Sequence, residues 1–150
     1  MLFRSIFDGR IAEDFKLNTG TWVSVGTLRA KFIEAGKGFI QDVVITGHDK
    51  SFIGAIVFLE MDYLKTHFGI ENTLHEEIAL KSKVSEHLNK IVSEFKAVST
   101  GSSTSIEKAI VSPFTLSAEK GEITDKGSIN QRAVLENRIK IVEKIYENSK

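Results

Sequence analysis

The fold depends on residues 52–59, the continuous apolar segment Phe52-Ile53-Gly54-Ala55-Ile56-Val57-Phe58-Leu59, which is bounded by charged turns. An apolar run of this length predicts a β-strand that is buried on both faces. Just before it, residues 39–46 contain the β-branched run Val43-Val44-Ile45 and predict a second strand. Further along, Ala109-Ile110-Val111 predicts a short strand that Pro113 ends.

Helices are expected around these strands. Four apolar residues share one helical face before Gly36, which is well placed to end that helix: Val25, Leu28, Phe32 and Ile33. Thr73 and Glu76 form a possible capping box that opens a long second helix. Its expected inner face consists of Val84, Leu88, Ile91, Phe95 and Val98.

A final helix is expected to start near Ser128. Ser128 and Gln131 have the spacing of a capping box, and an apolar series continues at helical spacing behind them. That series is Leu135, Ile139, Val142 and Tyr146. Together the elements predict an α+β fold, in which a small mixed β-sheet is flanked by helices.

The chain is expected to begin in a β-hairpin. Asp8-Gly9 is a typical hairpin turn, and it lies between the apolar-rich arms Leu2–Phe7 and Ile11–Leu17. With 150 residues, of which 41% are hydrophobic, residues 1–150 are long enough for one domain with its own core.

Composition excludes several classes of function. Twenty basic residues balance twenty acidic ones, so no general charge favours nucleic acid or an anionic membrane as a partner. The absence of cysteine excludes disulfides and thiolate chemistry. The N-terminal residues do not form a signal peptide, and no apolar run reaches transmembrane length, so we expect a cytoplasmic protein.

No metal site is expected. The segment His75-Glu76-Glu77-Ile78-Ala79 lacks the second histidine of a zinc protease helix, because position 79 is alanine. We expect His48, His67 and His87, which are far apart in the sequence, to be surface or packing residues. Trp22 could stack on a ligand, but an aromatic residue beside a helix start is more often part of the core.

Residues 121–132, Gly121-Glu122-Ile123-Thr124-Asp125-Lys126-Gly127-Ser128-Ile129-Asn130-Gln131-Arg132, carry the main functional signal. They place Lys126 between a glycine-flanked loop and an expected helix start. Unpaired amides at a helix N-terminus attract phosphate or carboxylate, and an adjacent ammonium group adds a full charge. The alternative is a solvated lysine in an ordinary turn.

Two stretches resemble one family. Residues 7–23 (Phe7-Asp8-Gly9-Arg10 to Gly20-Thr21-Trp22-Val23) resemble the hinge region that opens the C-terminal domain of adenylate-forming (ANL superfamily) enzymes. Residues 122–135 are similar to the tail of the feruloyl-CoA synthetase type of acyl-CoA ligase. The resemblance implies an enzyme that joins a carboxylic acid to AMP and passes the acyl group to coenzyme A, with the small domain rotating between the two half-reactions.

The resemblance also implies roles for individual residues. Lys126 would be the adenylation lysine, and Lys16 would face the site after rotation for thioester formation. Arg10 would contact the nucleotide, and Gly20 would let the backbone approach the pantetheine channel of coenzyme A. ATP and coenzyme A would be substrates. Magnesium would accompany ATP, with no metal ligand expected in this chain.

The sequence departs from the family pattern in three places. Ala12 occupies the usual hinge position and is followed by Glu13 and Asp14, so the pivot could be displaced. An additional residue between Lys16 and Gly20 leaves the assignment of Gly20 open by one place. Lys120 is the rival candidate for the adenylation lysine, and Lys126 is preferred because it lies closer to the expected helix start.

The chain is expected to lack the large N-terminal domain that holds the ATP and acid sites in this family. The leading interpretation is the C-terminal lid domain of an acyl-CoA ligase, occurring as a gene fragment, an expressed piece or a split subunit. Its expected partner is the large domain in cis or in trans, with a weak homodimer through the hairpin. The alternatives are a non-catalytic interaction or coenzyme A-binding module of the same fold, and an unrelated α+β protein. The sequence does not identify the acid.

Overall fold

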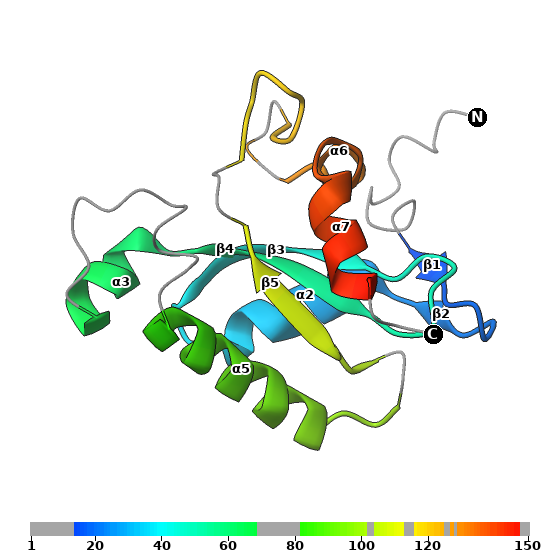
Figure 1. Ribbon diagram of the computed structural model, residues 1–150, viewed down its shortest axis with the longest axis horizontal. Coiled ribbons are helices and arrows are strands. Elements are labelled where there is room, and N and C mark those ends of the chain that lie inside the picture. The colour runs from blue at the N-terminus through cyan, green and yellow to red at the C-terminus, as the bar shows by residue number, and fades with distance from the viewer. Residues whose placement is uncertain are drawn as a thin grey trace.

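A three-stranded sheet carries the fold in the computed structural model, which describes residues 14–68, 82–101, 104–112, 116–124, 127 and 129–147. Its strands are β3 (Ile40–Thr46), β4 (Gly54–Leu59) and β5 (Lys108–Val111), in the order β3-β4-β5 (Figure 1). β3 and β4 are antiparallel, whereas β4 and β5 are parallel. The expected mixed sheet, with its three strands, is therefore confirmed.

β4 is the central strand, and all six of its residues are buried. Because side chains alternate across a strand, the sheet contributes to two separate cores. Ala55 and Val57 join one apolar cluster, whereas Ile56 and Phe58 join the other. The prediction that this segment is buried on both faces is confirmed.

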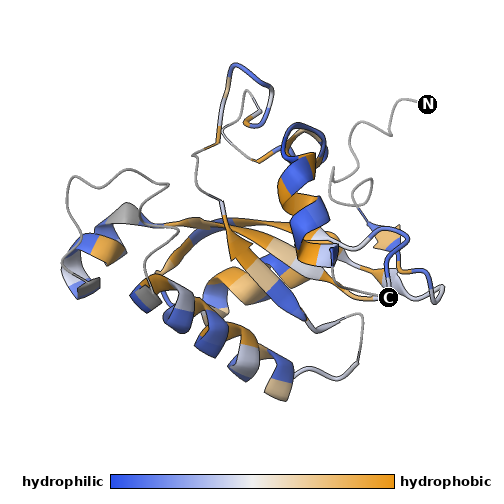
Figure 2. Ribbon diagram, viewed as in Figure 1, coloured by the Kyte–Doolittle hydropathy of each residue, from blue (hydrophilic) through white to orange (hydrophobic). Residues whose placement is uncertain are grey.

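Helices cover both faces of the sheet, which gives three layers (Figure 1). α2 (Val25–Ala35) and α5 (Ser82–Ala97) pack on one face, whereas α6 (Gln131–Asn137) and α7 (Ile139–Tyr146) pack on the other. α3 (Met61–Phe68) follows β4. Figure 2 shows the strands as mostly apolar and α5 as striped with polar and apolar residues. Within the residues described, no helix has the length and apolar character needed to cross a membrane.

The predicted apolar face of α2 is confirmed, and Gly36 is the C-cap of this helix. In α5 the predicted inner face is confirmed at Val84, Leu88, Ile91 and Phe95, which are all buried. It is wrong at Val98, which is 77% exposed, because the helix ends one residue earlier, at Ala97. The capping box expected at Thr73 and Glu76 lies outside the described residues.

The prediction for the C-terminal helix is wrong in two respects. α6 starts at Gln131 rather than near Ser128, and its N-cap is Asn130, whose Oδ1 accepts a hydrogen bond of 3.2 Å from the amide of Ala133. The single expected helix also breaks at Arg138, where φ is −115° and ψ is 36°. No glycine or proline lies at this break, and the apolar residues keep their helical spacing across it. The sequence pattern therefore predicts one continuous helix.

A small hairpin precedes α2. β1 (Phe15–Lys16) pairs with β2 (Trp22–Val23), whereas the expected Asp8-Gly9 turn lies outside the described residues. Backbone hydrogen bonds attach the hairpin to the β3–β4 connection, with Asn18 donating to Lys50 at 2.9 Å. Gly47 lies in this connection with φ of +146°, and an added Cβ would be 3.0 Å from the Phe15 ring. Glycine is therefore required where the hairpin meets the sheet.

Candidate functional site

The loop that contains Lys126 is closed by contacts between its two sides. Ile123 and Ile129 form an antiparallel bridge, and the amide of Gly127 donates to the carbonyl of Thr124 at 2.8 Å. Gly127 has φ of +84°, a left-handed conformation that glycine adopts without strain. We call residues 121–129 the lysine loop. Lys126 follows Thr124 by two positions, and its own placement lies outside the described residues.

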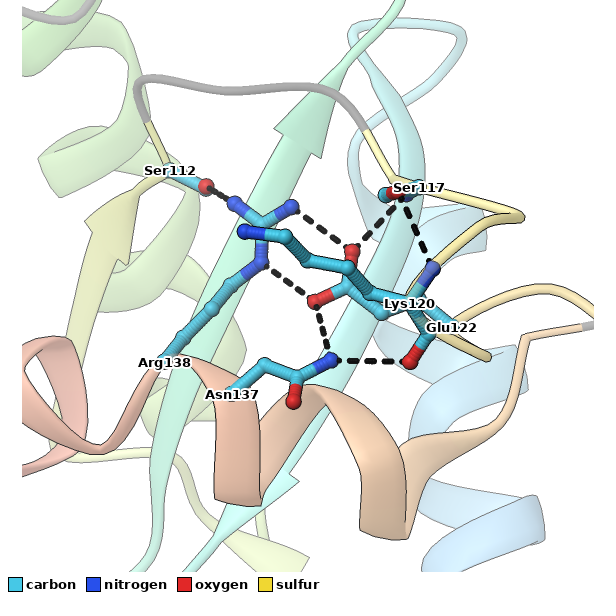
Figure 3. Close-up of polar contacts among 6 residues, drawn as sticks. All are labelled: Ser112, Ser117, Lys120, Glu122, Asn137 and Arg138. Carbon is cyan, nitrogen blue, oxygen red and sulfur yellow. Dashed lines mark hydrogen bonds and ion pairs between the residues drawn. The ribbon is translucent and has the colours of Figure 1, made fainter.

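A buried ion pair lies at the base of the lysine loop (Figure 3). The Glu122 side chain is 1% exposed and the Arg138 side chain 10% exposed. Arg138 Nε donates to Glu122 Oε2 and Nη2 donates to Oε1, both at 2.9 Å, so the pair is bidentate. The amide of Ser117 also donates to Oε1, at 2.8 Å. These hydrogen bonds, led by that from Arg138, hold the pKa of Glu122 below its usual value, against the opposing effect of burial.

The other contacts of Arg138 connect the lysine loop to the sheet (Figure 3). Its Nη1 donates to the hydroxyl of Ser112, which directly follows β5. Its guanidinium carbon lies 5.2 Å from the centre of the Phe58 ring, on β4. Since Arg138 is the residue between α6 and α7, its side chain joins the helix break, the loop and the sheet at one point.

Gln131 anchors the other end of the lysine loop. Its side chain is 2% exposed, and its Oε1 accepts a hydrogen bond of 2.9 Å from the amide of Ile45 on β3. β3 is an edge strand, so this contact satisfies an amide that has no strand partner on that side. The capping-box role predicted for Gln131 is therefore wrong, because its acceptor oxygen binds the sheet.

We predict that Gln131→Leu lowers the free energy of unfolding by about 1–3 kcal/mol, because it leaves the buried amide of Ile45 without an acceptor. Chemical denaturation measures this change. Arg132→Ala is the control, since Arg132 is exposed on the same helix turn and should alter stability by less than about 0.5 kcal/mol. Equal stability of the two variants would contradict the assigned contact.

Lys16 and Gly20 lie in the hairpin. Lys16 is exposed on β1, with its Nζ 5.5 Å from the centre of the Trp22 ring. Trp22 is 60% exposed, so the expectation that it belongs to the core is wrong. Gly20 lies in the exposed turn with φ of +89°, and no atom lies within 4 Å of an added Cβ. Figure 1 shows this hairpin and the lysine loop well apart, with α6 and α7 between them.

Asp14 is fixed to the folded body. Its Oδ1 accepts a hydrogen bond of 2.9 Å from the amide of Val25, the first residue of α2. The side chain of the N-cap residue, Ser24, makes no capping hydrogen bond. Asp14, which precedes the helix, therefore supplies an acceptor for one of the amides that the first helical turn leaves unpaired. The other two hinge candidates, Ala12 and Glu13, lie outside the described residues, as does Arg10.

Two of the histidines meet around Tyr63. The rings of Tyr63 and His67 are stacked at 3.9 Å, and the rings of Phe39 and His87 meet edge to face at 4.5 Å. Burial, followed by the charge of Lys90, lowers the pKa of His87. His87 is thus a packing residue, as predicted. Across the described ranges, no three histidine, aspartate or glutamate side chains gather as metal ligands would.

An apolar hollow of about 210 Å³ separates the hairpin from the C-terminal helices. Its lining includes Phe15 of β1 together with Leu135, Ile139, Val142 and Tyr146. These last four residues are the apolar series expected at helical spacing in the C-terminal helix. They line the same hollow, and Ile139 is 49% exposed.

Comparison with known proteins gives a family match and several structural matches. The family model for the AMP-binding enzyme C-terminal domain matches residues 24–150. The adenylation domain of a carboxylate reductase from Mycobacterium chelonae has a TM-score of 0.65 and 18% identity, covering 93% of this chain and 20% of that chain. No curated protein matches.

A second structural match comes from Segniliparus rugosus. The adenylation domain of its carboxylic acid reductase, in complex with AMP and a co-purified carboxylic acid, has a TM-score of 0.62 and 21% identity. The match covers 92% of this chain and 20% of that chain. This chain therefore spans about a fifth of the length of the matched chains, and at these identities the likeness establishes the fold alone.

Proposed function

This chain belongs to the family of AMP-binding enzyme C-terminal domains, and we propose that it is the mobile C-terminal domain of an AMP-forming carboxylic acid–CoA ligase. The acid's carboxylate would attack the α-phosphorus of ATP, giving acyl-AMP and releasing pyrophosphate. The thiol of coenzyme A would then attack the acyl carbonyl, losing its proton as AMP leaves. The observation that carries this proposal is the closed loop between Ile123 and Ile129, which contains Lys126.

Lys126 is proposed to stabilise the first transition state. Negative charge shifts between the carboxylate and phosphate oxygens as the acyl-AMP bond forms, and an ammonium group held nearby stabilises that charge. The bridge between Ile123 and Ile129 supports this role, because it fixes the two ends of the segment that contains Lys126. The rival candidate, Lys120, is exposed and lies before the bridge.

Lys16 and Gly20 are proposed to act in the second half-reaction. The hairpin presents Lys16 on its exposed side and places the left-handed Gly20 in a turn open to solvent. The separation of this hairpin from the lysine loop supports the proposal, because two groups on different parts of one rigid domain can serve one site in turn if the domain rotates (Figure 1).

The large N-terminal domain is the proposed partner. The chain spans about a fifth of the matched adenylation domains, and the remaining part would hold the acid and the ATP, with its magnesium. Arg10 would contact the nucleotide from this chain. Exposed apolar surface at Trp22 and Ile139 supports contact with a partner on the hairpin side.

The pivot for rotation is proposed to lie before Asp14. Because Asp14 accepts from the amide of Val25 and Phe15 is 8% exposed, both residues belong to the folded body. Ala12 and Glu13 are then the proposed hinge residues, because a backbone change at Asp14 would break its hydrogen bond to α2.

Two versions of the proposal differ in the group that accepts the acyl moiety, which is coenzyme A in a ligase and a different acceptor in other adenylate-forming enzymes. The likeness of residues 122–135 to feruloyl-CoA synthetase-type ligases favours coenzyme A. The matched structures are adenylation domains of carboxylic acid reductases, and one is a didomain that includes a PCP domain in complex with AMP. The competing class is a non-catalytic interaction or coenzyme A-binding module of the same fold.

We predict that the isolated chain releases no pyrophosphate with a panel of aliphatic and aromatic acids, because the sites for ATP and acid would lie on the large domain. The assay measures pyrophosphate release with and without a separately purified large domain. Activity only after that addition supports the ligase proposal. Turnover by the chain alone would contradict it, and inactivity in both cases would favour the non-catalytic module.

A further inference from the structure

We propose that Glu122 and Arg138 are positioning residues of the adenylation half-reaction, because their buried ion pair holds the base of the lysine loop and so orients Lys126. The inference rests on the proposed function of Lys126. It assigns a role to two side chains that neither the motif nor helical periodicity distinguishes, and the contacts that support it are all among described residues.

The geometry of the Glu122–Arg138 pair is better suited to orienting the lysine loop than to increasing the free energy of unfolding of the domain. Removing two charges from water costs several kcal/mol per ion, and a well-packed apolar pair of similar size is often as stable. A bidentate pair, by contrast, fixes both the distance and the relative orientation of its two partners. With Glu122 1% exposed and two contacts of 2.9 Å to Arg138, the carboxylate has little freedom to move.

Glu122 connects directly to both sides of the lysine loop. Its backbone carbonyl accepts a hydrogen bond of 2.8 Å from the amide of Asn130, which is the N-cap of α6. Its next neighbour, Ile123, forms the bridge to Ile129. Fixing the Glu122 side chain therefore fixes the entry to the loop and, through these two contacts, its exit.

The backbone of the loop cannot supply this constraint by itself. Gly121 and Gly127 have φ of +78° and +84°, and among the described residues beyond their chain neighbours no atom lies within 4 Å of an added Cβ at either position. Glycine has the widest choice of backbone conformations, so contacts with other groups limit the loop, and the hydrogen bonds around Glu122 are among them. A catalytic ammonium group needs such a limit, because a charge must be in place before the transition state forms.

Arg138 itself is not placed to bind substrate. Its side chain is 10% exposed, its Nε and Nη2 donate to Glu122, and its Nη1 donates to Ser112. Its guanidinium also lies against the Phe58 ring. A phosphate group would have to displace these contacts, so Arg138 acts through the loop and not on the nucleotide.

The test uses the full enzyme, with this chain joined to its large domain, and compares Glu122→Gln and Arg138→Lys with the parent. Both changes keep the approximate size of the side chain and remove the bidentate ionic geometry. We expect each to slow acyl-AMP formation by about 10- to 100-fold, the loss typical of a catalytic group displaced by about 1 Å. Thioester formation from supplied acyl-AMP and coenzyme A should keep its parental rate.

Leu88→Ala is the control for lost stability. Leu88 is 3% exposed on α5, on the opposite face of the sheet from α6 and α7, and its truncation destabilises the domain without touching the loop. At a temperature where all variants are folded, it should leave both half-reactions unchanged. If Glu122→Gln affects adenylation no more than Leu88→Ala does, the positioning proposal is overturned.

A double-mutant cycle distinguishes positioning from other effects. In a Lys126→Ala background, Glu122→Gln should slow adenylation by less than about twofold, because the group through which it acts is absent. A full additional loss would overturn the proposal. If Lys126→Ala alone leaves adenylation at the parental rate, the proposed function fails instead, so the two failures are distinguishable.

Hydrogen exchange gives a readout that does not depend on activity. The amide of Gly127 donates to Thr124 and that of Asn130 donates to Glu122, and in the full enzyme both should exchange at least tenfold faster in Glu122→Gln than in the parent. The same amides should be unaffected in Leu88→Ala. Unchanged exchange in Glu122→Gln would show that the ion pair does not hold the loop, and would overturn the proposal.

Discussion

Lys126→Ala is expected to slow acyl-AMP formation by about 100-fold or more in the full enzyme, the loss typical of removing one preorganised charge donor. The same variant should convert supplied acyl-AMP and coenzyme A to thioester at the parental rate. The reason is that a group acting only in the first transition state cannot stabilise the second. Rapid-quench measurement of each half-reaction separates the two rates.

Lys16→Ala should show the reverse defect, since Lys16 lies on the hairpin and is proposed to face the site after rotation. Lys120→Ala is the matched control, because it removes an exposed lysine six positions before Lys126 in the sequence. If Lys120→Ala loses adenylation and Lys126→Ala does not, the two lysines have been assigned in the wrong order. All three variants should retain parental stability to within about 0.5 kcal/mol.

Arg138→Ala is expected to lower the free energy of unfolding by about 3–5 kcal/mol, since it leaves the buried Glu122 carboxylate without its charged partner. In a domain of this size the melting temperature should fall by about 10 °C. The matched control is Glu107→Gln, which breaks the exposed Lys96–Glu107 pair, whose side chains are 43% and 42% exposed. It should cost less than about 1 kcal/mol.

The pH dependence of stability provides a second test of the ion pair. The pKa of Glu122 is lower in the folded state than the usual value of 4.5, because Arg138 donates to its ionised form. Its contribution is therefore fully present above that value and is lost as the pH falls through the folded pKa. Arg138→Ala should reduce this acid sensitivity. A variant with the parental pH profile below 4.5 would contradict the assignment.

Much of the fold follows from local patterns. The apolar run at residues 52–59 predicts the central strand, and periodicity predicts α2 and most of the inner face of α5. These elements are predictable because their side chains alternate or repeat with the geometry of the element itself. The error at Val98 occurs where α5 ends, because the position of a helix end depends on its neighbours.

The family and its lysine loop are also recognisable from the sequence. Two stretches in the correct order, residues 7–23 and 122–135, together resemble adenylate-forming enzymes, and the family match over residues 24–150 covers the second of them. The resemblance identifies the residue types at four positions, but their roles stay predictions until the half-reactions are measured. These positions are Lys126, Lys16, Arg10 and Gly20.

Only the tertiary structure decided how the loop is held. Glu122 and Arg138 are 16 positions apart, and Gln131 and Ile45 are 86 apart, so no local pattern links either pair. The break at Arg138 has the same origin, since no glycine or proline marks it and its side chain is bound by Glu122 and Ser112. A sequence specifies local periodicity directly, whereas contacts between distant buried polar groups form only when packed elements bring them together.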